Sequence, residues 1–175
     1  AARRQSLNRI AFGAAPMPPD LLARALQAWP DAEFFQAYGM TETAAAVCIN
    51  PPANHRPGMG AERHRHSVGR AGLGAEIRVV DPQGEEVPRG TVGEIVVRGP
   101  MVMRGYWNQP DATAQALRDG WLHTGDGGWM DEDGHLFIAD RLKDMIISGG
   151  ENVYSGEVET ALHSHPRVAQ AAVIG

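Results

Sequence analysis

The hydrophobic and polar positions follow different periodicities along the chain. Residues 9–12 form a short apolar run, residues 20–29 carry Leu, Ala and Trp at helical spacing, and residues 33–38 are again typical of a strand. A strand, helix and strand of this length predict two parallel strands joined by a crossover. The loops after these strands, Gly13–Pro16 and Gly39–Thr43, should therefore open onto one crevice, where α/β sheets bind ligands.

Beyond an irregular connector at residues 50–67, the pattern changes from helical to alternating. Residues 76–79 and 94–98 alternate charged and apolar side chains, which predicts half-buried antiparallel strands of a small sheet or barrel. Asp133-Gly134 is typical of a hairpin turn. Asp111 is expected to cap a short helix that ends at Leu117.

Residues 140–157 place a charged cluster before a short apolar strand, a Gly149-Gly150 turn and a helix opened by Ser155. A donor-rich joint between ordered elements is typical of a hinge, and a surface loop followed by a hairpin is the alternative. Val158, Ala161 and Leu162 share a helix face, and residues 168–174 predict a last strand.

The elements together predict a fold of mixed α/β and β class. We expect the end of a parallel α/β layer over residues 1–57 and a small antiparallel β-barrel-like subdomain over residues 58–140. Residues 141–175 should hold the hinge and the beginning of a small α+β C-terminal domain, within which the chain is cut.

Composition narrows the function classes. A hydrophobic content of 43% supports a real core, and a net charge of -5 without a basic face argues against a nucleic-acid binder. Cys48 is the only cysteine, so no intrachain disulfide is expected. No apolar run is long enough for a transmembrane segment and no signal core follows the N-terminus, so a cytoplasmic location is the default. Composition leaves the oligomeric state open.

Several residues could suggest metal or nucleophile chemistry, but their neighbours in the sequence do not support it. Counted from Asp131, the twelfth position of a calcium loop is Leu142, so a hairpin turn is favoured. The pairs His64 with His66 and His163 with His165 have no third ligand nearby in the sequence. Cys48 lacks an identifiable base and is expected to be an ordinary buried residue.

The stretch from Tyr38 to Glu42 is the first with candidate nucleotide chemistry. Thr41 could donate its hydroxyl to a phosphate, Glu42 could hold Mg²⁺, and Tyr38 offers an aromatic face to a planar base. The alternative is that Thr41 caps a helix whose first turn contains Glu42 and the following alanines.

Together, several stretches resemble the motifs of the adenylate-forming superfamily, with the closest likeness to AMP-forming acyl-CoA ligases. They are Gly13–Pro16, Tyr38–Glu42, Gly93–Trp107, Trp121–Asp126 and Asp140–Glu159. The resemblance implies a two-step reaction. A carboxylate attacks the α-phosphate of ATP to give an acyl-adenylate and pyrophosphate, and the CoA thiol then displaces AMP to leave a thioester.

The resemblance also implies a role for individual residues. Thr41 would bind the α-phosphate, Glu42 would ligate Mg²⁺, Asp126 would take the ribose hydroxyls, and Arg141 would reach the ribose and phosphates. The remaining nucleotide-binding positions would be Gly13, Ala14, Ala15, Tyr38, Gly39, Met40 and Ile138, of which Gly13–Ala15 and Tyr38 would enclose adenine. From its own neighbours, Asp126 could equally be a turn residue.

The C-terminal stretch would serve the second half-reaction. By resemblance, Lys143 occupies the hinge position about which the small domain swings between its two poses. Gly149, Gly150 and Glu151 would line the passage for the pantetheine of CoA, where glycines allow close backbone approach.

The resemblance leaves the acid and the acceptor open. Small apolar residues at 43–47 favour a fatty or aryl carboxylate over a charged one. The family's phosphate loop and its C-terminal lysine are absent from these 175 residues, so we expect no adenylation by this piece alone. The alternatives are a unit that loads a carrier protein, an oxidative relative of the luciferase kind, and a non-catalytic nucleotide-binding or interaction module.

Overall fold

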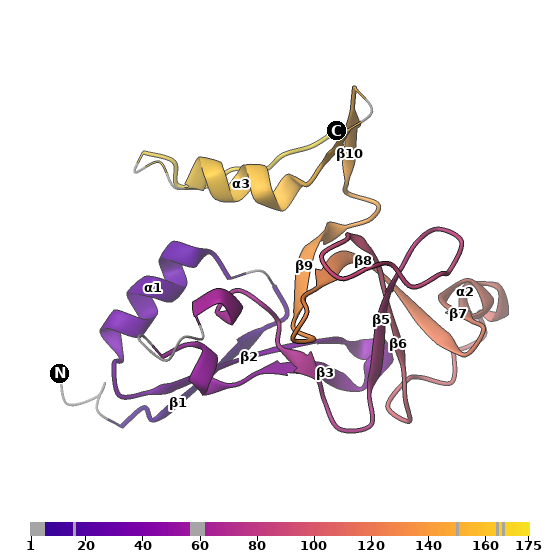
Figure 1. Cartoon of the computed structure of the whole chain (residues 1–175), viewed down its shortest axis with the longest axis horizontal. Coiled ribbons are helices and arrows are strands. Elements are labelled where there is room, and N and C mark those ends of the chain that lie inside the picture. The colour runs from indigo at the N-terminus through magenta and orange to yellow at the C-terminus, as the bar shows by residue number, and fades with distance from the viewer. Residues whose placement is uncertain (1–5, 16, 57–61, 150, 164, 166) are drawn as a thin grey trace.

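The computed structural model describes residues 6–175 except 16, 57–61, 150, 164 and 166. The first part of the chain forms a four-stranded sheet in the order β1-β2-β3-β4 (Figure 1). Its strands are β1 (Arg9–Gly13), β2 (Glu33–Met40), β3 (Ala45–Asn50) and β4 (Arg70–Ala71). Strands β1 and β2 are parallel and are joined by helix α1 (Pro19–Ala28), which confirms the predicted strand-helix-strand unit.

Helix α1 follows its predicted apolar stripe only in part. Leu22 is buried, but Leu21 is 44% exposed. The helix begins with Pro19. A backbone N–H in the first turn has no intrahelical acceptor, so proline loses no hydrogen bond at this position.

Strand β3 was not predicted, because its start depends on a turn without glycine. A short 3₁₀ helix, η1 (Thr41–Thr43), ends at Ala44 in the left-handed conformation, and β3 then returns antiparallel to β2. The helix-cap interpretation of Thr41 is therefore wrong: Met40 holds the N-cap position, and the alanines leave the helix. A Cβ at Gly39 would lie 1.8 Å from the Ala45 carbonyl oxygen, so this return requires glycine.

The second sheet is antiparallel, as the alternating pattern predicted. Its order is β5-β6-β8-β7, with β9 paired to β8. The strands are β5 (Glu76–Val80), β6 (Gly93–Arg98), β7 (Leu117–Arg118), β8 (Trp121–Met130) and β9 (Leu136–Arg141). Helix α2 (Pro110–Ala116) precedes β7, with Gln109 and not the predicted Asp111 at its N-cap. The predicted hairpin turn between β8 and β9 is confirmed by the bond that Gly134 N donates to Asp131 O.

The interpretation of Asp126 as a turn residue is wrong, because residues 121–130 form one continuous strand. Gly125 has a φ of 71°, and the β8–β9 pairing shifts register between Gly127 and Gly128. The glycines therefore bend a strand and do not end it.

One apolar cluster joins the two sheets. It contains Val47 and Cys48 of β3, Val68, Ile95 of β6 and Leu136 of β9, all buried. Burial raises the pKa of the Cys48 thiol to about 12, which makes it a packing residue. The connector from β3 to β4 carries the 3₁₀ turns η2 (Pro52–Asn54) and η3 (Glu62–His64), and it contacts the second sheet where Val68 N donates to Leu136 O.

The C-terminal segment forms a small unit of its own beside the two larger sheets (Figure 1), and Ser155 Oγ joins it to β9 by a hydrogen bond to Asp140 Oδ2. It consists of the hairpin β10 (Ile146–Ser148) and β11 (Glu151–Val153) and of helix α3 (Ser155–His163), which begins at the predicted Ser155. The strand predicted at 168–174 is wrong: this stretch is irregular and pairs with no described strand. Within the described residues, no helix is long and apolar enough to cross a membrane.

His55 provides a test of this packing through pH. Its side chain is buried after η2, with its ring 5.4 Å from the ring of Phe12 between centroids. Burial, and then the charge of Arg65, lowers the pKa of His55 from 6.5 to about 4. The unfolded chain therefore binds a proton in this window that the folded protein does not bind, and stability falls as the pH falls from 6.5 towards 4.

We predict that His55→Gln, which cannot titrate, removes on the order of 3 kcal/mol of this pH-dependent loss, at 1.36 kcal/mol for each pKa unit. Urea unfolding at neutral pH and near the lower pKa, with exposed His165→Gln as the control, measures the difference. The same pH-dependent loss in wild type and His55→Gln would contradict the assignment.

Candidate nucleotide site

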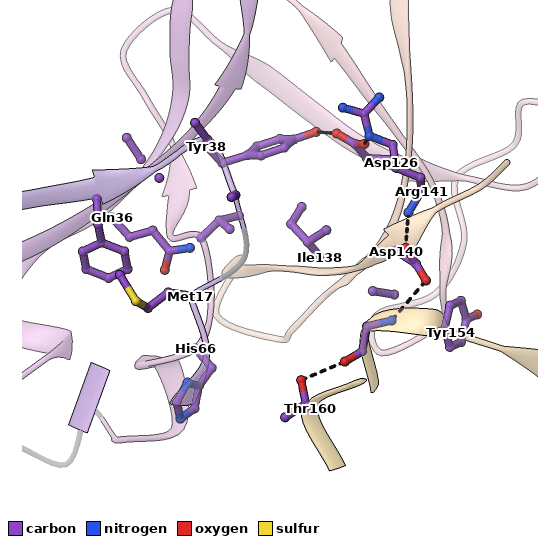
Figure 2. A pocket seen from close by; sticks show the side chains of 18 of the residues that line it. Met17, Gln36, Tyr38, His66, Asp126, Ile138, Asp140, Arg141, Tyr154 and Thr160 are labelled. Carbon is purple, nitrogen blue, oxygen red and sulfur yellow. Dashed lines mark hydrogen bonds and ion pairs between the residues drawn. The ribbon is translucent and has the colours of Figure 1, made fainter. Parts of the chain in front are cut away.

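A cavity lies where the first sheet, strands β8 and β9 and the C-terminal segment meet. It has a volume of about 690 Å³ and is lined from residues as distant in sequence as Phe12 and Thr160 (Figure 2). The carboxyl ends of the parallel strands β1 and β2 open into it, as the sequence predicted. The predicted nucleotide residues that line it are Gly13, Ala14, Ala15, Tyr38, Gly39, Met40, Asp126, Ile138 and Arg141.

Asp126 is the centre of the polar part of this cavity. It is 6% exposed, and both of its carboxylate oxygens have partners. The Tyr38 hydroxyl donates to Oδ2 at 2.7 Å, and Arg141 Nε lies 2.8 Å from Oδ1 (Figure 2). Tyr38 comes from β2, whereas Asp126 and Arg141 are opposite each other in the β8–β9 ladder. Three strands therefore position one buried carboxylate.

The electrostatics fix the donor and acceptor roles. Burial, and then the negative charge of Asp126, raises the pKa of Tyr38 well above its ordinary value. The phenol therefore keeps its proton and donates a hydrogen bond to the carboxylate. A buried carboxylate between a hydroxyl and a guanidinium can accept further hydroxyl donors from a ligand, since each oxygen has two lone pairs.

Thr41 and Glu42 lie one turn beyond the residues that line the cavity. Both belong to η1, which follows Met40 directly. The Tyr106 hydroxyl donates to Glu42 Oε1 at 2.8 Å, and the Met103 amide donates to Glu42 O at 2.7 Å. The hydrogen bond to Glu42 raises the pKa of Tyr106. The loop before α2 thus holds Glu42 from both its backbone and its side chain.

Of the residues expected to serve the second half-reaction, those that the structure describes do not reach the cavity. Lys143 is exposed between β9 and β10, and Gly149, with a φ of 62°, turns the chain from β10 to β11. Glu151 is exposed on β11, and Gly150 lies outside the described residues. The structure brings neither Lys143 nor the described part of the hairpin to the Tyr38–Asp126–Arg141 group.

Several lining residues were not predicted from the sequence. Each of them is an ordinary residue for the helix, strand or loop that contains it, so nothing in the sequence marked it as functional. They are Trp129 and, labelled in Figure 2, Met17, Gln36, His66, Asp140 and Tyr154. Ser155 Oγ donates to Asp140 Oδ2 at 2.6 Å, and the Gly156 amide lies 3.4 Å from the same oxygen. Burial raises the pKa of Asp140, but hydrogen bonds from Ser155 and from backbone amides outweigh it and hold the pKa below its usual value.

The fold and the cavity define a class of site in which a planar base can lie beside an aromatic ring and a hydroxylated group beside a carboxylate. Residues 1–107 match the family model described as AMP-binding enzyme. The chain belongs to this family, and its fold is that of the adenylate-forming enzymes among its structural neighbours.

Curated relatives include two kinds of ligase. The chain is 48% identical to a feruloyl-CoA synthase from an Amycolatopsis species over 170 residues, covering 97% of this chain and 33% of that protein. It is 46% identical to the fatty acid–[acyl-carrier-protein] ligase ScoC of Streptomyces coeruleorubidus, covering 97% of this chain and 32% of that one. The chain thus spans about a third of the length of these relatives.

Solved structures show the same fold. The amide bond synthetase McbA from Marinactinospora thermotolerans matches with a TM-score of 0.86 and 44% identity, covering 98% of this chain and 33% of that one. The o-succinylbenzoate CoA synthetase of Bacillus subtilis, in complex with ATP and magnesium ion, matches with a TM-score of 0.84 and 36% identity, covering 99% and 36%.

We predict that Tyr38→Phe destabilises the folded protein by about 1–3 kcal/mol, because buried Asp126 loses one of its two partners. Tyr154→Phe is the matched control, since Tyr154 lines the same cavity but makes no side-chain hydrogen bond to another described residue. Urea unfolding of both variants measures the difference. Equal stability of Tyr38→Phe and Tyr154→Phe would show that the bond to Asp126 contributes nothing.

Proposed function

We propose that the whole protein is an ATP-dependent, AMP-forming ligase that activates a carboxylic acid as an acyl-adenylate and transfers the acyl group to CoA. The observation that carries the proposal is the convergence of Tyr38, Asp126 and Arg141 on one cavity, in a chain of the AMP-binding family. A cavity of about 690 Å³ is within the range of sites that enclose a nucleotide-sized ligand.

In this proposal the cavity holds the adenosine of ATP and of the acyl-adenylate. The backbone at Gly13–Ala15 and the ring of Tyr38 enclose the adenine, with Ile138 on a further wall. Asp126 accepts hydrogen bonds from the ribose hydroxyls, and the half-exposed guanidinium of Arg141 turns from Asp126 towards the ribose and phosphates. Because both partners of Asp126 are donors, the carboxylate is held as an acceptor before the ligand binds.

Thr41 and Glu42 act at the phosphate end. η1 places them directly after the cavity residue Met40, where the Thr41 hydroxyl donates to the α-phosphate. Glu42 fits a magnesium ligand: Tyr106 binds Oε1, the other oxygen remains available, and Mg²⁺ needs few carboxylates when substrate phosphates supply the rest. When bound, Mg²⁺ offsets the negative charge that develops on the phosphates.

CoA is the first choice of acceptor, and a carrier protein is the second. A relative named as a CoA synthase supports the first, and the carrier-protein ligase ScoC, at nearly the same identity, supports the second. Gly149, Glu151 and Lys143 lie outside the cavity, as expected if they act only after the C-terminal segment has moved. A fatty or aryl acid suits the small side chains at 43–47, of which Thr43 and Val47 are buried.

The test uses the full-length protein with a panel of fatty, aryl and dicarboxylic acids. We expect acid-dependent exchange of pyrophosphate into ATP, followed by thioester formation that depends on CoA. Asp126→Ala should lower kcat/KM for ATP by about 10–100-fold, because hydrogen bonds to a charged group contribute about 1.5–3 kcal/mol. Absence of exchange with every acid would contradict the ligase; exchange followed by acyl transfer only to a carrier protein would select the second acceptor.

The hinge role gives a separate prediction for Lys143. Proline at 143 fixes the backbone φ of an exposed joint between β9 and β10, so the C-terminal segment should no longer reach its second pose. We predict that Lys143→Pro leaves pyrophosphate exchange nearly unchanged but lowers thioester formation at least about tenfold. Lys143→Ala, which keeps the backbone free, is the control and should retain both steps. Loss of both half-reactions to the same degree would rule out the hinge assignment.

A further inference from the structure

A second group of side chains lies away from the nucleotide site, between the connector and the β8–β9 turn. From the sequence, His64 was considered together with His66, and no third ligand lay nearby in the chain. The structure instead brings Asp131 and His135 to His64. One imidazole nitrogen of each histidine and one carboxylate oxygen of Asp131 all lie within 4.8 Å of one another. His64 and His135 are 7% and 6% exposed.

The two histidines have unsatisfied atoms that face this group. His64 Nε2 and His135 Nδ1 are buried and make no hydrogen bond within the described part of the chain. His64 Nε2 lies 3.1 Å from Asp131 Oδ2, and His135 Nδ1 lies 3.8 Å from Asp131 Oδ1. Buried polar atoms rarely make no hydrogen bond, so two imidazole nitrogens beside one carboxylate point to a ligand that all three groups could share.

Asp131 is already oriented for such a ligand. Its Oδ1 accepts hydrogen bonds from the amides of Asp133 and His135 at 3.0 and 2.8 Å, in the tight turn between β8 and β9. Oδ2 is therefore held towards His64. Asp133, whose Oδ2 is 3.5 Å from His64 Nε2, is paired with Arg63 and so is less free to act as a ligand.

We propose that His64, Asp131 and His135 form a binding site for a divalent transition-metal ion of the zinc type, which ties the connector to the β8–β9 turn. Two imidazole nitrogens and one carboxylate oxygen are a donor set that suits Zn²⁺, whereas Mg²⁺ and Ca²⁺ prefer oxygen alone. A separate cavity of about 490 Å³, lined by His64, Asp133 and His135, gives the ion an entry path and room for water as the fourth ligand.

Metal binding requires two local changes. The rings stack in parallel at present, with centroids 3.6 Å apart and planes inclined by 11°, and must rotate so that both lone pairs converge on one ion. Asn54 Nδ2 lies 3.2 Å from His135 Nε2 and also donates to Asn50 Oδ1 at 2.6 Å. A metal on Nδ1 places the His135 proton on Nε2, and Asn54 must then turn its amide oxygen to accept it.

The site would also order one wall of the nucleotide cavity. The residues after His64, Arg65 and His66, line that larger cavity. The connector is otherwise held near this point by the bonds that Asn50 Nδ2 donates to the carbonyls of His64 and Ser67, at 2.9 and 2.8 Å. A metal at His64 would add a side-chain anchor to this backbone anchor, independently of the ligase activity.

The test is titration of the full-length, chelator-treated protein with Zn²⁺ and with Co²⁺, in excess Mg²⁺ to occupy oxygen-only sites. We expect one ion per chain, Co²⁺ visible absorption typical of a four-coordinate site, and a Tm that rises by roughly 2 °C or more at 100-fold excess over Kd. His64→Gln and His135→Gln should each weaken binding by at least about 100-fold. Loss of a residue that only hydrogen-bonds to a metal ligand costs about 10–100-fold, and loss of a ligand itself should cost more. Exposed His165→Gln is the matched control and should bind as wild type.

A structural role for the histidines without a metal predicts a different result. Zinc binding at the proposed atoms shifts the imidazole ¹⁵N resonances of His64 and His135 and moves the His135 proton to Nε2. This measurement on the wild-type protein decides the question even where a glutamine variant fails to fold. Unchanged resonances at saturating Zn²⁺, or binding retained in both His64→Gln and His135→Gln, would overturn the proposal.

Discussion

The buried carboxylate of Asp126 is the constraint on which the rest of the structure depends. A carboxylate that is 6% exposed needs partners, because an unpaired buried charge costs several kcal/mol. Tyr38 supplies one partner from the first sheet, and Arg141 supplies the other from the end of β9. The fold can therefore bury Asp126 only when β2, β8 and β9 meet correctly, and that same arrangement forms the cavity.

The shared core makes this meeting possible. Val47 and Cys48 belong to the first sheet and Leu136 to the second, yet they pack in one apolar cluster, so the sheets cannot shift independently. Irregularities in the strand pairing then set the direction of the functional side chains. The pairing of β2 with β3 shifts register at Tyr38 and Gly39, and that of β8 with β9 shifts at Gly127 and Gly128, beside Asp126.

Two further contacts connect the site to its surroundings. Asp140, one residue before Arg141, binds Ser155 at the start of α3, and so links the nucleotide cavity to the C-terminal segment across the proposed hinge at Lys143. The bond between Tyr106 and Glu42 links the loop before α2 to the end of β2. Motion of the C-terminal segment in the proposed reaction would break the first contact and leave the second in place.

The sequence by itself determined the elements whose patterns are local and the residues whose motifs are specific. The strand-helix-strand unit, the alternating strands, the β8–β9 turn and the positions of Tyr38, Asp126 and Arg141 around one cavity could all be anticipated. Strand β3, the bond between Tyr106 and Glu42, and the group of His64 with Asp131 and His135 could not. These depend on a turn without glycine or on contacts between residues more than 60 positions apart, which only tertiary packing decides. The irregular C-terminal stretch follows the same rule, because an apolar run becomes a strand only beside another strand.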